Sequence, residues 1–230
     1  MKADVTSKTV LGFIFLIAYM AIAAASYFFS AGQIDLPLAW LYFILNLVIG
    51  LSFSLVLART APDLIAERLK PGPGEQDHVT KIAGLLLLLL QLILAGLDVG
   101  RYHWTAPTSA AVQIAALVLA MVGYSLAAWA TYTNRFFSSA VRLQTDRQQV
   151  VVDQGPYAYV RHPGYTGIIV YLMFSGLALG SWIGALVAGL PMLLLILRRT
   201  VLEDSMLQKG LLGYEAYAAR VKYRLLPGVW

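Results

Sequence analysis

Long apolar runs separated by short polar segments dominate this chain. Each run has the length, roughly 17–25 residues, that a helix needs to cross the hydrocarbon core of a bilayer. The six runs cover roughly residues 9–31, 37–58, 81–99, 110–131, 164–180 and 182–200. In lipid a helix satisfies its backbone hydrogen bonds within the segment itself. The pattern therefore predicts an all-α fold, a polytopic membrane helical bundle of about six transmembrane helices.

Composition agrees with a membrane protein. Hydrophobic residues make up 59% and charged residues 13% of the 230 residues, which is more apolar surface than a soluble fold of this length buries. The first run is too long for the apolar region of a cleaved signal peptide, so we expect it to remain as a helix. The absence of cysteine excludes thiolate nucleophiles, iron–sulfur clusters and zinc thiolate sites. Three scattered histidines predict no metal site.

The basic residues predict the orientation. All 17 Lys and Arg residues except Arg101 lie before the first run, between runs two and three, between runs four and five, or where the sixth run ends and beyond it. The positive-inside rule then places both termini in the cytoplasm, and we expect an integral membrane protein, of the bacterial inner membrane. We attribute the net charge of +5 to topology and to contact with anionic membrane lipids, not to nucleic acid.

The sixth run continues into a polar helix. After Pro191 no Gly or Pro interrupts the chain until Gly210, which predicts a helix of about 30 residues and about 45 Å. Its last turns must leave the bilayer and carry Glu203 and Asp204 into the cytoplasmic headgroup zone. Arg199 lies one turn before Glu203 and can pair with it at i,i+4.

A cationic cluster precedes the fifth run. Pro163 suits the first position of a helix, and His162 before it is pushed toward extended geometry. Arg161 and His162 then lie at the positive N-terminal end of that helix, where we expect unpaired backbone N–H groups that attract an anion. Gly164 and Gly167 allow close approach of a ligand or of a neighbouring helix.

These features form part of a longer motif. It has a Gly-x-Tyr segment, Arg-His-Pro-x-Tyr-x-Gly, a helical hairpin, an acidic pair with a leucine three residues on, Gly-Tyr-x-x-Tyr and a terminal Arg-Leu-x-Pro. The matching residues are Gly155, Tyr157, Arg161, His162, Pro163, Tyr165, Gly167, Glu203, Asp204, Leu207, Gly213, Tyr214, Tyr217, Arg224 and Pro227. As a combination they resemble the isoprenylcysteine carboxyl methyltransferase family and its phospholipid N-methyltransferase relatives, in a bacterial-type integral membrane form. The resemblance covers about a third of the chain.

The resemblance implies a division of the chain and a set of site residues. Residues 151–230 would form a cytoplasmic methyltransferase-like module around S-adenosylmethionine, and residues 1–150 would form the acceptor side. Arg161 and Glu203 would be catalytic. The residues implied to bind the cofactor are Gly155, Tyr157, Arg161, His162, Tyr165, Gly167, Glu203, Asp204 and Leu207. The family's usual Glu-Glu is Glu203-Asp204 here, so the second carboxylate is one methylene shorter.

The chemistry of these residues agrees with that cofactor. Arg161 and His162 suit its carboxylate, and Glu203 with Asp204 suits its cation or its ribose. A thiolate or carboxylate acceptor needs no general base, whereas an amine acceptor needs one, for which Glu203 or His162 is the candidate. We therefore expect an S-adenosylmethionine-dependent methyltransferase for a hydrophobic or lipid-like acceptor with an isoprenylcysteine-like carboxylate, a thiol or an amine. That acceptor would enter from the lipid.

Two other classes of protein remain open. A membrane reductase of the sterol or steroid type has a similar Arg-His segment but would bind NADPH. The proline after His162 and the acidic pair at Glu203 favour the sulfonium cofactor, since two phosphates prefer basic residues. A non-enzymatic membrane scaffold would bind no small molecule. The sequence leaves the acceptor, the choice among O-, S- and N-methylation, and the oligomeric state open.

Overall fold

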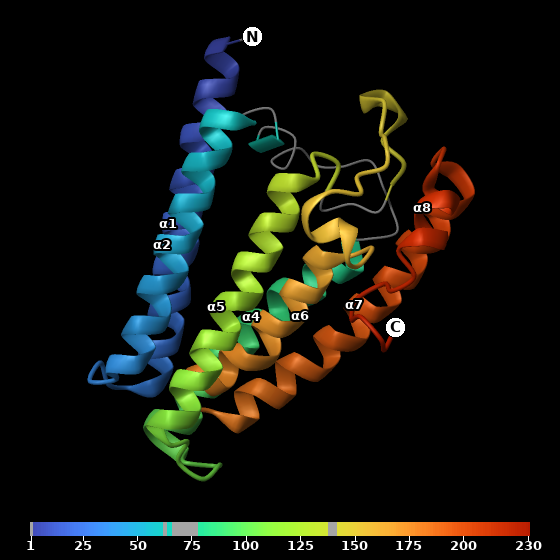
Figure 1. Ribbon diagram of the computed structural model, residues 1–230. Coiled ribbons are helices and arrows are strands. Elements are labelled where there is room, and N and C mark those ends of the chain that lie inside the picture. Colours follow the sequence, from blue (N-terminus) through green and yellow to red (C-terminus); the bar gives the residue numbers. More distant parts are fainter. Residues whose placement is uncertain (1, 62–63, 66–77, 138–141) are drawn as a thin grey trace.

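The computed structural model describes residues 2–61, 64–65, 78–137 and 142–230. No strand occurs in these ranges, and helices form most of them (Figure 1). The elements are α1 (Lys2–Ala31), α2 (Pro37–Thr60), α4 (His78–Leu97), the π-helix η2 (Asp98–Tyr102), α5 (Ala110–Thr133), the 3-10 turns η3 (Thr145–Arg147) and η4 (Gly155–Ala158), α6 (Pro163–Ala178), α7 (Trp182–Gly210) and α8 (Tyr214–Arg220).

The predicted polytopic bundle is confirmed. Five helical segments are long and apolar enough to cross a membrane, and the sixth apolar helix, α6, has 16 residues. The five segments are Thr9–Ala31, Pro37–Thr60, Ile82–Tyr102, Ala110–Thr133 and Trp182–Gly210. The protein is thus an integral membrane protein. With a length of about 24 Å, α6 is shorter than the roughly 30 Å hydrocarbon core, so one of its ends lies within the membrane.

Helix α7 continues past the apolar run, as the sequence predicts. Its 29 residues give a length of about 43 Å, which exceeds the roughly 30 Å of hydrocarbon. Asp204 lies about 33 Å along this helix from Trp182, so it falls near the boundary between hydrocarbon and headgroups. The helix therefore delivers polar side chains to the membrane surface.

The two ends of the bundle differ in packing. At the end opposite α8, aromatic and aliphatic side chains of α1, α2, α4, α5 and the α6–α7 turn form one buried core. Within it the Tyr27 hydroxyl donates to the Leu179 carbonyl at 2.8 Å. Toward the other end the helices separate, and a large cavity lies between them. The packed end thus closes the bundle on one side only.

Helices α5 and α6 pack closely through glycines. A Cβ atom added at Gly167 would lie 2.5 Å from the Gly123 carbonyl oxygen, and one added at Gly123 would lie 2.7 Å from the Gly167 carbonyl oxygen. Small residues allow such close approach of membrane helices. This contact fixes α6, and with it the Arg161-His162 segment, against α5.

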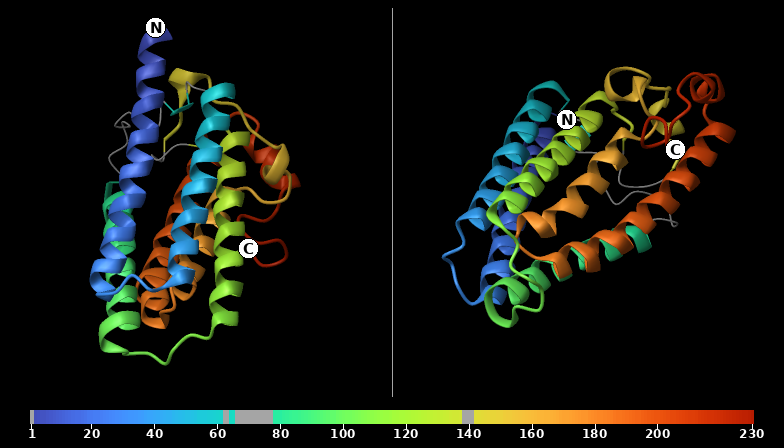
Figure 2. Two further views of the ribbon diagram at one scale, coloured as in Figure 1. Left: turned by 90° about the vertical axis from the view of Figure 1, so that its left-hand side faces the viewer. Right: turned by 60° about the horizontal axis from the view of Figure 1, so that its bottom comes forward.

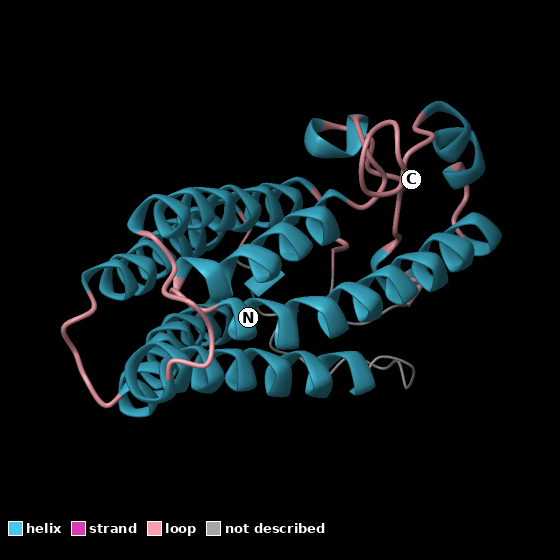
Figure 3. Ribbon diagram, turned by 90° about the horizontal axis from the view of Figure 1, so that it is seen from below, coloured by secondary structure: helices cyan, strands magenta, loops and turns pink. Residues whose placement is uncertain are grey.

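Helices α6 and α7 diverge from the turn that joins them. The right-hand view of Figure 2 shows the C-terminal tail between their far ends, and Figure 3 shows loops and α8 gathered at the same end. The tail is held there by backbone hydrogen bonds, since Arg161 N donates to Tyr223 O at 2.9 Å and His162 N donates to Arg224 O at 2.8 Å. The α8 end of the bundle therefore brings the site segments together.

Candidate functional site

The Asp204 carboxylate is the centre of the polar network at the α8 end. It is buried on α7 and pairs with the Arg161 guanidinium at two points, Nε to Oδ1 at 2.8 Å and Nη2 to Oδ2 at 3.0 Å. The other side chains in contact with it are His162 at 3.3 Å, Gln208 at 3.0 Å, Tyr214 at 3.0 Å and Arg224 at 2.8 Å. The hydrogen bonds from Arg161 and Arg224 join oppositely charged groups, and such hydrogen bonds are stronger than those between neutral groups. Asp204 thus ties α6, α7, α8 and the tail into one unit.

Arg161 is also committed to the protein. Its Nη1 donates to the carbonyls of Val221 at 2.8 Å and Lys222 at 2.9 Å, and only 7% of the residue is exposed. With Asp204 on its other edge, this guanidinium is neutralised and positioned internally. The structure brings the predicted residues Arg161, His162 and Asp204 together, but it pairs them with one another.

The N-terminus of α6 differs from the sequence expectation. The backbone N–H groups of Arg161 and His162 were predicted to be unpaired, and this was wrong because both donate to carbonyls of the C-terminal tail. Pro163 does begin α6, as predicted. The C-terminal tail reaches the start of α6 through contacts between residues that are far apart in the sequence. A local sequence pattern does not predict such contacts.

Glu203 belongs to a second group on the adjacent face of α7. It accepts a short hydrogen bond from the Tyr165 hydroxyl, which in turn accepts a hydrogen bond from Arg199 Nε at 2.5 Å. The Arg199 guanidinium also lies over the Tyr165 ring, 5.3 Å from its centre, and the His162 ring stacks on the same tyrosine with 5.6 Å between ring centres. The two carboxylates therefore have different surroundings, and the direct pairing of Arg199 with Glu203 stays a prediction.

A small cavity of about 40 Å³ lies beside Glu203, and we call it the α8 pocket. Its walls are Asn134, Phe136, Phe137, Gln149, Val150, Val151, Val152, Tyr157, Arg161, His162, Glu203, Leu207, Leu211, Tyr214 and Tyr217. Among the predicted cofactor-binding residues, five line it and four do not. The four are Gly155, Tyr165, Gly167 and Asp204.

Two of the predicted residues that do not line the α8 pocket, Gly155 and Gly167, support the segments that form its walls. Gly155 has a φ of +56°, a conformation that favours glycine, and it opens η4, which carries Tyr157. The Tyr157 carbonyl accepts a hydrogen bond of 2.8 Å from the Tyr217 hydroxyl. Gly167 serves the packing of α5 on α6 described above. These positions set the geometry of the pocket from behind its walls.

The tyrosines of α8 remain hydrogen-bond donors. Burial, followed by the neighbouring Asp204 carboxylate, raises the pKa of Tyr214 above its ordinary value. Burial likewise raises the pKa of Tyr217. Both hydroxyls are therefore protonated at neutral pH and hold α8 over the pocket.

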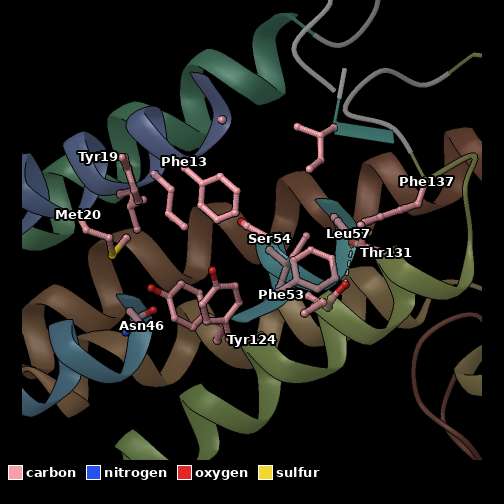
Figure 4. A pocket seen from close by; sticks show the side chains of 18 of the residues that line it. Phe13, Tyr19, Met20, Asn46, Phe53, Ser54, Leu57, Tyr124, Thr131 and Phe137 are labelled. Atoms are coloured by element: carbon pink, nitrogen blue, oxygen red, sulfur yellow. Dashed lines mark hydrogen bonds between the residues drawn. The ribbon is translucent and has the colours of Figure 1, made fainter. Parts of the chain in front are cut away.

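A second and larger cavity, the bundle cavity, has a volume of about 570 Å³ (Figure 4). Its walls are Thr9, Gly12, Phe13, Leu16, Tyr19, Met20, Asn46, Phe53, Ser54, Leu57, Ile65, Gly84, Leu88, Tyr124, Ala127, Ala128, Thr131, Phe137, Ile168, Tyr171, Leu172 and Met192. These side chains come mainly from membrane helices and are largely apolar. The cavity has the size of a small-molecule site.

Phe137 lines both cavities. Its ring lies against Gly164, where an added Cβ would come within 2.7 Å of the ring, and it meets the Tyr165 ring edge-on at 5.8 Å. One aromatic side chain therefore stands between the apolar bundle cavity and the polar α8 pocket.

Sequence reasoning did not select several residues of this site. Tyr214 and Arg224 lie within the motif that resembled the methyltransferase family, so that motif could have indicated them. Phe137 and Gln208 carried no local signal. Their roles follow from the tertiary structure alone.

Comparison with known proteins agrees with this geometry. Residues 115–209 match the family described as isoprenylcysteine carboxyl methyltransferase (ICMT). The match begins in α5, ends in α7, and includes the Arg161-His162 segment with Glu203 and Asp204. A protein-S-isoprenylcysteine O-methyltransferase of Schizosaccharomyces pombe is 30% identical over 87 residues, which are 37% of this chain and 36% of that protein. The match thus spans about a third of the relative's length.

The helical bundle, with a polar pocket at one end and an apolar cavity inside, defines the class of the protein, a polytopic membrane protein with adjoining polar and apolar cavities. Residues 115–209 are similar to the isoprenylcysteine carboxyl methyltransferase family, so the resemblance predicted from the sequence is confirmed. The names of the family and of the relative both describe carboxyl methyltransferases.

Proposed function

We propose that the protein transfers a methyl group from S-adenosylmethionine to a hydrophobic, lipid-like acceptor, in the first instance a carboxylate of the isoprenylcysteine type. The observation that carries this proposal is the position of Phe137. This ring is shared by an apolar cavity inside the bundle and a polar pocket beside Glu203. A reaction between an apolar acceptor and a charged, water-soluble donor requires two such compartments side by side.

The lining of the α8 pocket suits S-adenosylmethionine chemically. Glu203 supplies a carboxylate for a cationic or hydroxyl group, and the rings of Tyr157, Tyr214 and Tyr217 supply faces that stabilise a cation or stack on a base. Arg161 and Asp204 hold this lining in place, because their charges are satisfied by each other. The pocket of about 40 Å³ has room for roughly one water molecule. Binding of the much larger cofactor therefore requires the walls of this pocket to move apart.

The bound cofactor would supply an electrophilic methyl group, and the protein's task is alignment and the exclusion of water. Glu203 orients the donor from the polar side. The Phe137 ring stands at the junction and keeps water from it, and the Tyr165 ring supports it through their edge-on contact. An ionised carboxylate acceptor needs no proton removed, so in this reaction Glu203 acts by binding and orientation.

The bundle cavity suits the apolar part of the acceptor. Its walls carry no charged side chain among the described residues that form them. Each methylene that enters contributes about 0.8 kcal/mol of partitioning. The acceptor would keep its carboxylate near Phe137 and its chain between the helices, with the α8 end of the bundle and both termini on the cytoplasmic side.

NADPH fits the α8 pocket less well. Two phosphates and a 2′-phosphate favour several free basic groups. The described lining of this pocket contains no lysine, and its Arg161 is paired with Asp204. This favours the methyltransferase over the membrane reductase.

Methyl transfer to matched acceptors tests the proposal. We expect the purified protein to methylate N-acetyl-S-dodecylcysteine with an apparent KM at least about tenfold below that for N-acetyl-S-methylcysteine, because of chain burial. Glu203→Gln should abolish turnover, whereas Glu215→Gln, an exposed residue of α8, should not. Absence of methyl transfer to any acceptor, or equal KM values for the two thioethers, would contradict the proposed function.

A further inference from the structure

The deep end of the bundle cavity, away from Phe137, carries a group of hydroxyls. Tyr19 of α1, Tyr124 of α5 and Tyr171 of α6 line the cavity there together with Asn46 of α2. Figure 4 shows Tyr19, Asn46 and Tyr124 at the same end of the cavity. Such polar positions among membrane helices are expensive unless they are paired or bind something.

Two of the groups in this cluster are paired within the protein. The hydroxyls of Tyr42 and Tyr171 share a hydrogen bond of 2.7 Å, and Asn46 Nδ2 donates to the Tyr42 carbonyl at 2.8 Å. By contrast, neither the Tyr19 nor the Tyr124 hydroxyl forms a hydrogen bond with any residue the structure describes. The Tyr124 hydroxyl lies against α2 at Gly50, 2.8 Å from the position of an added Cβ. Both hydroxyls therefore face the cavity with unused donors.

The position of these hydroxyls gives the length of the site. The cavity follows α1 from Thr9 to Met20 and α2 from Leu57 back to Asn46. Each stretch advances eleven positions, which corresponds to about 16 Å of helix. The hydroxyls of Tyr19 and Tyr124 lie at the end of this apolar stretch. A chain that fills the cavity from Phe137 would bring its far end to them.

We infer that Tyr19 and Tyr124 determine specificity by binding a neutral oxygen, a hydroxyl or a carbonyl, at the far end of the acceptor's apolar chain. The inference rests on the proposed function in taking the bundle cavity as the acceptor's site. The group is neutral because no charged side chain occurs among the described walls of the cavity. An acceptor that ends in plain hydrocarbon leaves both hydroxyls without a partner, which disfavours its binding.

Equilibrium binding of two matched probes tests the inference without requiring turnover. The probes are N-acetyl-S-dodecylcysteine and N-acetyl-S-(12-hydroxydodecyl)cysteine, titrated calorimetrically into the detergent-purified protein. The two probes partition differently into micelles, so their Kd values are not compared directly. Instead, the ratio of the two Kd values is determined for the parent and for the double variant Tyr19→Phe/Tyr124→Phe, and the two ratios are compared. We expect the preference for the hydroxylated probe to fall by about 3- to 10-fold in the double variant, the effect of one neutral hydrogen bond. Tyr132→Phe, an exposed position on α5, should leave the ratio unchanged.

Thermal unfolding provides a second, ligand-free readout. Removal of hydroxyls that bind nothing in the free protein should leave the unfolding midpoint of the double variant at or above that of the parent. An unchanged probe ratio, or a midpoint lowered by the loss of internal hydrogen bonds, would overturn the inference. Failure of the protein to methylate either probe, with the binding preference intact, would count against the proposed function instead.

Discussion

The Asp204→Ala substitution removes the carboxylate on which the α8 end of the bundle depends. In the parent this group neutralises Arg161, whose side chain is 6% exposed, and Arg224, whose side chain is 32% exposed. It also accepts hydrogen bonds from Gln208 and Tyr214. The variant leaves two guanidinium groups close together without a counter-charge, and one of them is buried.

The size of the effect follows from the burial of Arg161. Loss of one partner of a buried ion pair typically lowers the free energy of unfolding by about 3–5 kcal/mol. For a chain of 150–250 residues each kcal/mol changes the unfolding midpoint by about 2–4 °C. We therefore expect Asp204→Ala to lower the midpoint by about 6–20 °C.

Thermal unfolding of the detergent-purified protein measures this, with an exposed ion pair as the control. Asp146 pairs with Arg142 at 2.7 Å, but its side chain is 59% exposed, and exposed pairs contribute little. Asp146→Ala should leave the midpoint where it is. The double variant Arg161→Met/Asp204→Leu should be less destabilised than Asp204→Ala, because it removes the buried charge together with its partner.

The reasoning would be refuted if Asp204→Ala unfolded at the same temperature as Asp146→Ala. It would also be refuted if the double variant were less stable than Asp204→Ala alone. Either result would mean that Arg161 and Asp204 do not form a mutually dependent buried pair.

Three further predictions concern the pocket, the helix packing and the topology. Glu203→Gln should weaken S-adenosylhomocysteine binding by about 10- to 100-fold, the effect of a hydrogen bond to a charged group, with an unchanged unfolding midpoint; parent-like affinity would remove Glu203 from the site. Gly167→Val should destabilise the protein by about 1–3 kcal/mol, since its Cβ would lie 2.5 Å from the Gly123 carbonyl oxygen, and a parent-like midpoint would contradict the α5–α6 contact. The chain has no cysteine, so His103→Cys and Glu215→Cys should label from opposite sides of sealed vesicles; labelling from one side would contradict the topology.

The helices could be predicted from the sequence because the membrane imposes a simple rule. An apolar run of sufficient length has only one way to satisfy its backbone in lipid, so the runs and the observed helices agree. Pro163 also determined where α6 begins, since proline suits the first turn of a helix. Local rules of this kind needed no knowledge of tertiary contacts.

The roles of the two carboxylates could not be separated in the same way. Adjacent residues on a helix point about 100° apart, so Glu203 and Asp204 cannot both face Arg161. The sequence contains the pair but not the rotation of α7 about its axis. The structure turns Asp204 toward Arg161 and Glu203 toward Tyr165 and the pocket. The site residues that came from the motif stay predictions for cofactor contact until binding is measured.

Phe137 and the tail show a second limit of sequence reasoning. The tail contacts Arg161 and His162 across about 60 positions, and the Phe137 ring takes its place from the space left by Gly164. Neither contact is indicated by a periodic pattern of residues in the sequence. Both depend on how α6 and α7 diverge.

Calorimetric binding of S-adenosylhomocysteine and of NADPH to the purified protein tests the central claim most directly. S-adenosylhomocysteine should bind with saturable heat that is strongly reduced by Glu203→Gln and unchanged by Glu215→Gln, and NADPH should give no specific heat. Saturable binding of NADPH without binding of S-adenosylhomocysteine would assign the α8 pocket to a reductase, and binding of neither would contradict a cofactor site beside Glu203.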